Sequence, residues 1–264
     1  MLRKILILVG LSWVAIQASA QIRYSKLTLK PKEVFELKGS DILVVDTLTM
    51  MDSSKLILNK LKTENYIHAK VAIFHKGAFI DGKGIPGIHG RNGHSGVSVT
   101  TPCTDGKSGL TGSNGTNGAH GLSLFLYFSD IRVPGTLYID VSGGDGADGG
   151  QGGDGGGGGP GTRLCRGGSG GSGGSGANGG NGGDGGSVTF YARRIPELRT
   201  MLNEKIFIRT FGGNQGQGGD GGAGGYSGLS PADDSKMDGK HGRKGPKGIE
   251  GNPGKPGAIN FEDK

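Results

Sequence analysis

Glycine returns at every third position in six separate stretches of this chain, and this spacing constrains the fold more than any other feature. A period of three fits neither the 3.6-residue repeat of an α-helix nor the two-residue repeat of a β-strand. It is the period of the left-handed polyproline II helix, in which a residue without a side chain lets another backbone come close. The six stretches, called runs one to six below, are Gly84–Gly96, Gly106–Gly121, Gly143–Gly161, Gly167–Gly185, Gly213–Gly228 and Gly239–Gly257.

Short segments rich in β-branched, aromatic and aliphatic residues precede and separate the runs. Residues 22–81 hold several of them, and their alternation predicts two or three coils of a β-solenoid or a small sandwich. Later segments of the same kind lie within 122–141, 187–211 and 258–261. Short connections favour antiparallel runs, which would place these segments and 78–81 at one end.

The predicted fold class is therefore mainly β plus polyglycine II. A β-rich segment at 21–83, either a short solenoid or a sandwich, is followed at 84–264 by a bundle of six antiparallel left-handed polyglycine II helices with β-strands at one end. The other connections, 97–105, 162–166 and 229–238, would then meet at the distal tip.

The two cysteines fall in the first two of these tip connections. Cys103 and Cys165 should meet if the runs are antiparallel, and a disulfide is the expected state in an exported protein. Such a bond would close a loop of roughly 60 residues, worth about 4 kcal/mol in the chain-entropy model. Two free thiols are the alternative.

Residues 1–20 have the features of a secretory signal. Arg3 and Lys4 precede an apolar stretch from Ile5 to Ile16, and Ala18-Ser19-Ala20 is a cleavage site of the A-x-A type. No later apolar run could cross a bilayer. The sequence predicts a protein that is secreted, periplasmic or held at the cell surface.

Composition leaves two alternatives open. Glycine supplies 59 of 264 residues, a bias that often indicates disorder, although the strict triplet phase opposes this interpretation. The formal charge is +7, and an anionic polymer or a plain solvated surface could account for it. Export and the lack of interleaved aromatic residues argue against nucleic acid. The cations of run six are Lys240, Arg243, Lys244, Lys247 and Lys255.

Three further segments are distinctive: Gly182–Ala192 (GGDGGSVTFYA), Leu198–Leu202 (LRTML) and Gly212–Gly216 (GGNQG). Together they resemble the glycine-rich N-terminal domain of Obg-type GTPases. The resemblance implies six polyglycine-type helices beneath a β-structured end, and it extends over roughly 100–130 residues. It implies no nucleotide chemistry, because the chain has no G-x-x-x-x-G-K-[S/T] motif.

The same architecture resembles the receptor-binding tips of some phage adhesins and a glycine-rich arthropod antifreeze protein. Run six also resembles collagen, which would suggest a trimeric surface protein. The chain has ten prolines, few for a collagen helix.

Metal sites have weak support in the sequence. Gly143–Asp148 matches the start of a calcium-binding nonapeptide, which makes Asp145 and Asp148 weak Ca²⁺ candidates. The repeat does not continue, so they and the similar Asp154 and Asp184 are better explained as surface carboxylates. His89 and His94 occupy different edges of run one, which disfavours a chelating pair. We expect no metal and no cofactor.

The chain carries no G-x-S-x-G, no H-E-x-x-H and no Cys–His nucleophile context, so we do not expect an enzyme. The expected function is structural or adhesive: a stiff scaffold presents tip loops or a flat face to a surface polysaccharide or an envelope protein. An ice- or carbohydrate-surface binder is the alternative. The candidate tip-binding residues are Tyr226, Ser230, Asp233, Asp234, Lys236 and Asp238.

Overall fold

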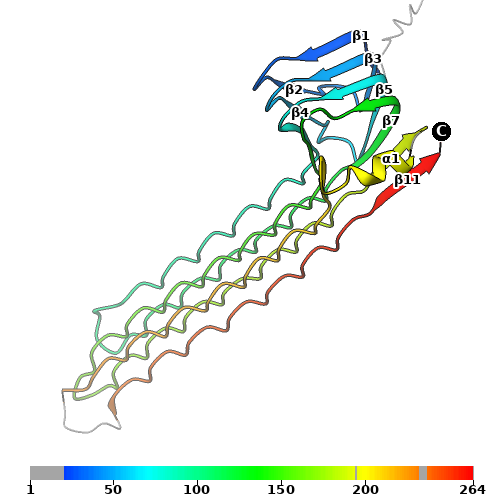
Figure 1. Ribbon diagram of the computed structural model, residues 1–264. Coiled ribbons are helices and arrows are strands. Elements are labelled where there is room, and N and C mark those ends of the chain that lie inside the picture. The colour runs from blue at the N-terminus through cyan, green and yellow to red at the C-terminus, as the bar shows by residue number, and fades with distance from the viewer. Residues whose placement is uncertain (1–20, 194, 232–236, 264) are drawn as a thin grey trace, which may run out of the picture.

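The computed structural model describes residues 21–193, 195–231 and 237–263, as an elongated molecule with a β-structured head at one end (Figure 1). The expected signal sequence at 1–20 lies outside these residues. Within them, the regular elements are eleven strands and one helix. They are β1 (Ile22–Leu29), β2 (Val34–Glu36), β3 (Ile42–Met50), β4 (Lys55–Ile57), β5 (Glu64–Phe74), β6 (Ala78–Asp81), β7 (Ser123–Arg132), β8 (Leu137–Asp140), β9 (Val188–Ala192), α1 (Ile195–Thr200), β10 (Ile206–Arg209) and β11 (Ile259–Asp263).

The strands form two parallel sheets. The first has the order β1-β3-β5-β7-β9-β11 and the second has the order β10-β8-β6-β4-β2. The chain alternates between the sheets, so each coil of the head adds one strand to each. Every described pairing is parallel, and β5 joins β7 with Ile67 opposite Leu126. The head is thus one continuous stack of parallel coils.

Alternation along the strands builds the core between the two sheets. In β3 the buried residues Leu43, Val45, Leu48 and Met50 alternate with more exposed ones, with one break at Asp46 and Thr47, as expected for side chains that point to opposite faces. Three phenylalanines, Phe74, Phe128 and Phe190, are among the largest fully buried side chains. Helix α1 contributes Leu198, which is 1% exposed, to the same core.

The connections from the second sheet back to the first differ greatly in length. In the first two coils they are short, at 37–41 and 58–63. In the next three they span 82–122, 141–187 and 210–258, and each contains two glycine-rich runs. The runs extend away from the head and return to it, forming a long projection that we call the arm (Figure 1). The arm therefore consists of three corner connections drawn out from a coiled β-structure.

Backbone hydrogen bonds between runs hold the arm together. The N–H of Gly87 donates to the carbonyl of Asp145 at 2.8 Å, and this relation advances in step along runs one and three, which are parallel. The N–H of Thr116 donates to the carbonyl of Ile88 at 3.0 Å. In the bonds that follow along the arm, residue numbers fall in run two while they rise in run one, so these two runs are antiparallel. Consecutive runs are thus antiparallel. Runs one, three and five form one layer, and runs two, four and six form the other.

Glycine is required because the backbones touch. A Cβ on Gly84 would overlap the carbonyl oxygen of Ala119, and a Cβ on Gly109 would overlap that of Gly153. In the described runs, no backbone hydrogen bond joins two residues of the same run, so bonds to neighbouring runs take up the N–H groups of their glycines. The period of three follows from which residues face a neighbouring run.

The fold class expected from the sequence is wrong. No helix is assigned in the glycine-rich runs of the described chain, so the structure shows no bundle of six left-handed polyglycine II helices; the runs are extended segments without regular secondary structure. The strands at 122–141, 187–211 and 258–261 are not a separate end of such a bundle, because they continue the parallel sheets begun at residue 22. The collagen-like interpretation is not supported either, since run six bonds to runs four and five of its own chain.

Candidate functional site

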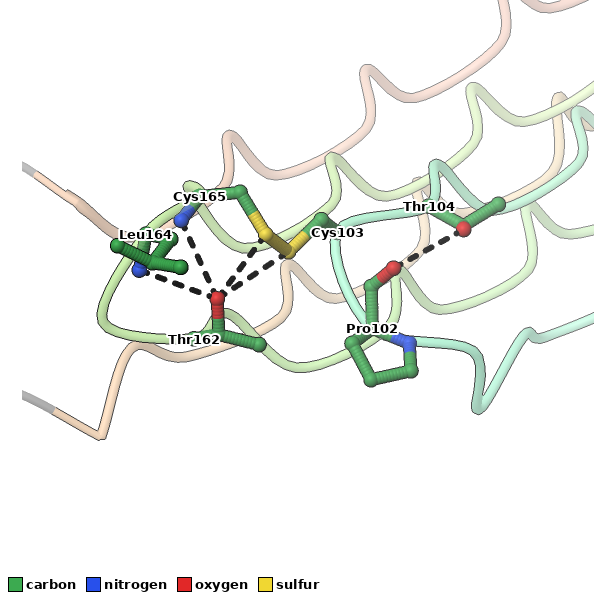
Figure 2. The surroundings of a disulfide bond; sticks show 6 residues. All are labelled: Pro102, Cys103, Thr104, Thr162, Leu164 and Cys165. Atoms are coloured by element: carbon green, nitrogen blue, oxygen red, sulfur yellow. Dashed lines mark hydrogen bonds between the residues drawn. A yellow bond between two sulfur atoms is a disulfide. The ribbon is translucent and has the colours of Figure 1, made fainter.

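The tip, the end of the arm farthest from the head, is closed by a disulfide between Cys103 and Cys165, with the two Cα atoms 6.0 Å apart (Figure 2). Cys103 lies in the connection between runs one and two, and Cys165 between runs three and four. The hydroxyl of Thr162 accepts bonds from the N–H groups of Leu164 and Cys165, each at 3.2 Å. The disulfide and the turn around Cys165 fix two of the three tip connections to each other.

The third tip connection is described in part. Within it, the N–H of Ser230 donates to the Asp238 carboxylate at 2.7 Å. Tyr226 is 81% exposed, and its ring lies edge-on to His241 with the centroids 5.9 Å apart. These contacts bring three of the candidate residues to the tip. The other three, Asp233, Asp234 and Lys236, lie outside the described residues.

Exposed apolar side chains also gather at the tip, which the sequence analysis did not single out. Leu164 is 96% exposed and Leu229 is 67% exposed, and both belong to tip connections. The N–H of Gly161 donates to the Leu229 carbonyl, which joins the ends of runs three and five. Apolar side chains exposed on a cross-linked support are a common feature of contact surfaces.

One broad face of the arm carries carboxylates with a structural role. Asp145, Asp148 and Asp154 in run three accept the N–H groups of the aligned residues in run five, each at 2.7 Å. These N–H groups face the groove between two runs of one layer, where no backbone carbonyl reaches them. These side-chain acceptors therefore add hydrogen bonds between runs three and five to those of the backbone.

The opposite face uses amide, imidazole and carboxylate acceptors in the same way. The Asn117 amide oxygen accepts the N–H of Asn181 at 2.8 Å, and Asn181 accepts that of Asn252 at 2.7 Å. His120 and Asp184 act similarly, with the Asp184 N–H donating to His120 Nδ1 at 2.9 Å. These rows cross runs two, four and six, and they make the face regular in two directions.

The weak metal candidates can be placed in this network. Asp145 and Asp148 each cap a backbone N–H, and His89 Nδ1 accepts the Asp148 N–H at 3.2 Å. His94 stands in the next-but-one triplet of run one. Among the described residues, no group of three or more His, Cys, Asp or Glu side chains could hold a metal ion.

A row of stacked rings crosses the outer face of the six-stranded sheet. His68 stacks on Tyr127 at 4.2 Å, and Tyr127 stacks on Tyr191 at 4.3 Å. Because the ring faces cover one another, the row presents ring edges rather than flat faces to solvent. This geometry stabilises neighbouring strands and does not suit stacking against a sugar ring.

The cavity beside α1 is small. It is lined by Asp130, Arg193, Glu197 and apolar neighbours, and its volume of about 30 Å³ leaves room for only a few water molecules. In the described parts of the chain, none of the helices has the length and apolar character needed to span a membrane.

Comparisons with known proteins assign no family. No family model matches the chain, and no curated protein matches it. One solved structure has a weak similarity: the nine-helix polyproline type II bundle of a springtail antifreeze protein from Granisotoma rainieri. It is 22% identical, covers 66% of this chain and 94% of its own, and has a TM-score of 0.13.

Proposed function

We propose that this protein is an exported, non-enzymatic adhesion or structural protein whose arm holds a contact surface at the tip, away from the head. The single observation that carries the proposal is the exposure of three apolar side chains, Leu164, Tyr226 and Leu229, at one disulfide-closed end of the arm. The partner is a surface polysaccharide or an envelope protein.

The arm suits this role because it combines reach with order. Backbone bonds recur at each triplet of adjacent runs along its length, and the disulfide joins two of its three connections at the far end. A loop of the same length without these bonds would be mobile and would lose entropy on binding. A preorganised tip avoids that cost.

The test is a binding screen on intact bacterial cells and on a glycan array. The protein is compared with a triple variant, Leu164→Ser, Tyr226→Ser and Leu229→Ser, which removes apolar surface from exposed positions only. We expect the variant to lose at least tenfold in binding, because apolar contact at the centre of an interface dominates its affinity.

The matched control places the same chemical change elsewhere. The control replaces three exposed apolar residues on the head and near the base of the arm by serine. They are Leu61, Ile85 and Ile88, which are 93%, 56% and 76% exposed. Binding that survives in the tip variant, or that falls equally in the control, contradicts a contact surface at the tip.

A second candidate, a binder of ice or of crystalline carbohydrate, is favoured by the regular rows across runs two, four and six. Side chains that repeat along a run and between runs could match a periodic solid. Thermal hysteresis of a purified solution tests the ice version directly. An absence of hysteresis at millimolar protein rejects it.

A further inference from the structure

Run six forms one edge of the arm and carries a concentrated positive charge. Four cations lie within eight residues: Lys240, Arg243, Lys244 and Lys247. All four side chains are exposed. Triplets of an extended chain are at most about 10 Å apart, so the cations form a line rather than a cluster. We call these four residues the basic strip.

The basic strip forms no ion pair with the described residues. The ion pairs between described residues lie on the head or between runs one and three and runs two and four; none involves run six. Glu250 lies beyond the strip, on the side toward the head. The long cationic side chains of the basic strip are therefore available to an external anion.

Hydroxyl groups lie along the inner side of the strip. Run four is hydrogen-bonded to run six, with the N–H of Gly170 donating to the Lys240 carbonyl and that of Gly173 donating to Arg243, both at 2.8 Å. The register that pairs Asn178 with Ile249 therefore sets Ser169 beside Lys240 and Ser172 beside Arg243. Hydroxyls can donate and accept, and cations bind carboxylate or sulfate by charge-assisted bonds.

We infer that the basic strip and the adjoining serines bind a linear anionic polysaccharide along the edge of the arm. The cations supply the charge complement, the serine hydroxyls suit sugar hydroxyls, and the straight run suits an extended polymer. This inference goes beyond the proposed function, because it requires the strip and does not require the tip.

Nucleic acid fits the same strip less well. Duplex DNA carries about one negative charge per 1.7 Å, whereas the strip offers four cations spread along about 25 Å of extended chain. The described residues of run six include no aromatic residue other than His241, which already contacts Tyr226. Base stacking, a usual contribution to single-strand binding, has little support here.

The experiment measures binding of the full chain to named polymers. Alginate and heparin represent carboxylated and sulfated polysaccharides, and dextran is the neutral control. A DNA duplex and phosphatidylserine vesicles represent the competing anions. We expect alginate or heparin to bind, dextran not to bind, and the DNA and vesicles to bind more weakly than the polysaccharide.

A quadruple variant, Lys240→Gln, Arg243→Gln, Lys244→Gln and Lys247→Gln, tests the strip. We expect at least a tenfold loss of affinity and a shallower salt dependence, with the slope of log K against log salt reduced by about three. The matched control is Lys26→Gln, Lys30→Gln, Lys62→Gln and Lys76→Gln, all exposed on the head. It makes the same change in net charge.

The results separate this inference from the proposed function. Equal losses in the strip variant and the control, no polysaccharide binding, or tighter binding of DNA or vesicles overturns the inference. The serine variant of the tip should still bind alginate or heparin. Failure of the tip experiment alone leaves the strip standing, and failure of the strip experiment leaves the tip standing.

Discussion

The head and the arm share one chain path but are stabilised by different means. In the head, two parallel sheets enclose large apolar side chains, and Phe74, Leu48 and Leu126 are fully buried. In the six runs of the arm, the buried apolar side chains are two alanines, Ala147 and Ala177. There the backbones themselves make contact. A continuous coiled chain can thus be stabilised by apolar side chains that exclude water, or by direct backbone contact at positions that have no side chain.

The comparison also explains where the arm can start. The first two coils close with short corners and already pair in both sheets, β1 with β3 and β2 with β4. Their pairing does not depend on glycine. The arm, in contrast, departs from strands of the head and returns to them. We expect damage to the head to reach the arm, and damage to the arm to remain local.

The largest effect should come from the core of the head. Phe74→Ala removes a fully buried ring that lies 6.0 Å from the ring of Phe128, and it should lower the free energy of unfolding by about 3–5 kcal/mol. Urea unfolding measures this loss, with hydrogen exchange to show protection falling in both regions. Val34→Ala, at a side chain 58% exposed, is the control. Unchanged protection in the arm would contradict its dependence on the head.

Removal of the disulfide should have the next largest effect. Cys103→Ser with Cys165→Ser frees a connection with a sequence separation of 62 residues, and the chain-entropy model gives a loss of up to about 4 kcal/mol. Hydrogen exchange should rise at the tip and along runs one to four, while the strands of the head stay protected. Equal loss of protection in β3 and β5 would refute the local character of the arm.

Two neighbouring glycines test whether backbone contact holds the arm. A Cβ on Gly156 would overlap the carbonyl of Val97, whereas a Cβ on Gly157 would come no closer than 3.5 Å to the Ser98 hydroxyl oxygen. Gly156→Ala should therefore cost about 1–3 kcal/mol by overpacking, and Gly157→Ala should be close to neutral. Thermal unfolding of the two variants measures the difference. Similar midpoints would contradict the role assigned to glycine.

The sequence analysis located the strands better than it located their partners. The expected segment 78–81 coincides with β6, and the β-rich residues 22–81 contain all of the strands β1 to β6. The strands within 122–141 were expected only to lie together at one end of a bundle. Instead β7 pairs with β5 and β8 with β6, in different sheets. Local alternation indicates a strand, but it carries no information on which strand lies beside it.

The acceptor rows had a signal in the sequence that was not used. Side-chain to backbone bonds recur at fixed separations of 59, 64, 69 and 71 residues, which are the lengths of successive coils. A search for repeats at those separations would have aligned Asn117 with Asn181. The exposed apolar tip has no such signal, because only the fold brings the connections that hold Leu164 and Leu229 to the same end of the arm.

A smaller effect should follow from removing a single side-chain acceptor. Asp148→Ala leaves the Gln217 N–H without its acceptor at 2.7 Å and should cost about 1 kcal/mol. Asp148→Asn should restore most of the lost stability, because the Asn178 side chain accepts the Ile249 N–H in the same way. Asp220→Ala is the control, because run five is the last run of its layer. Equal costs at Asp148 and Asp220 in thermal unfolding would remove the capping role.

The smallest expected effect is a dependence of stability on alkaline pH that arises in the head and not in the arm. A hydrogen bond to the Glu64 carboxylate, aided by partial burial, raises the pKa of Tyr66 to about 12. Since tyrosine in an unfolded chain titrates near pH 10, the folded state keeps a proton that the unfolded state loses, and stability falls between about pH 10 and 12. Tyr66→Phe should flatten that fall in urea unfolding measured from pH 9 upward. Tyr226→Phe, on the arm, should leave the slope unchanged; a matching change there would mean that the pH dependence does not arise at Tyr66.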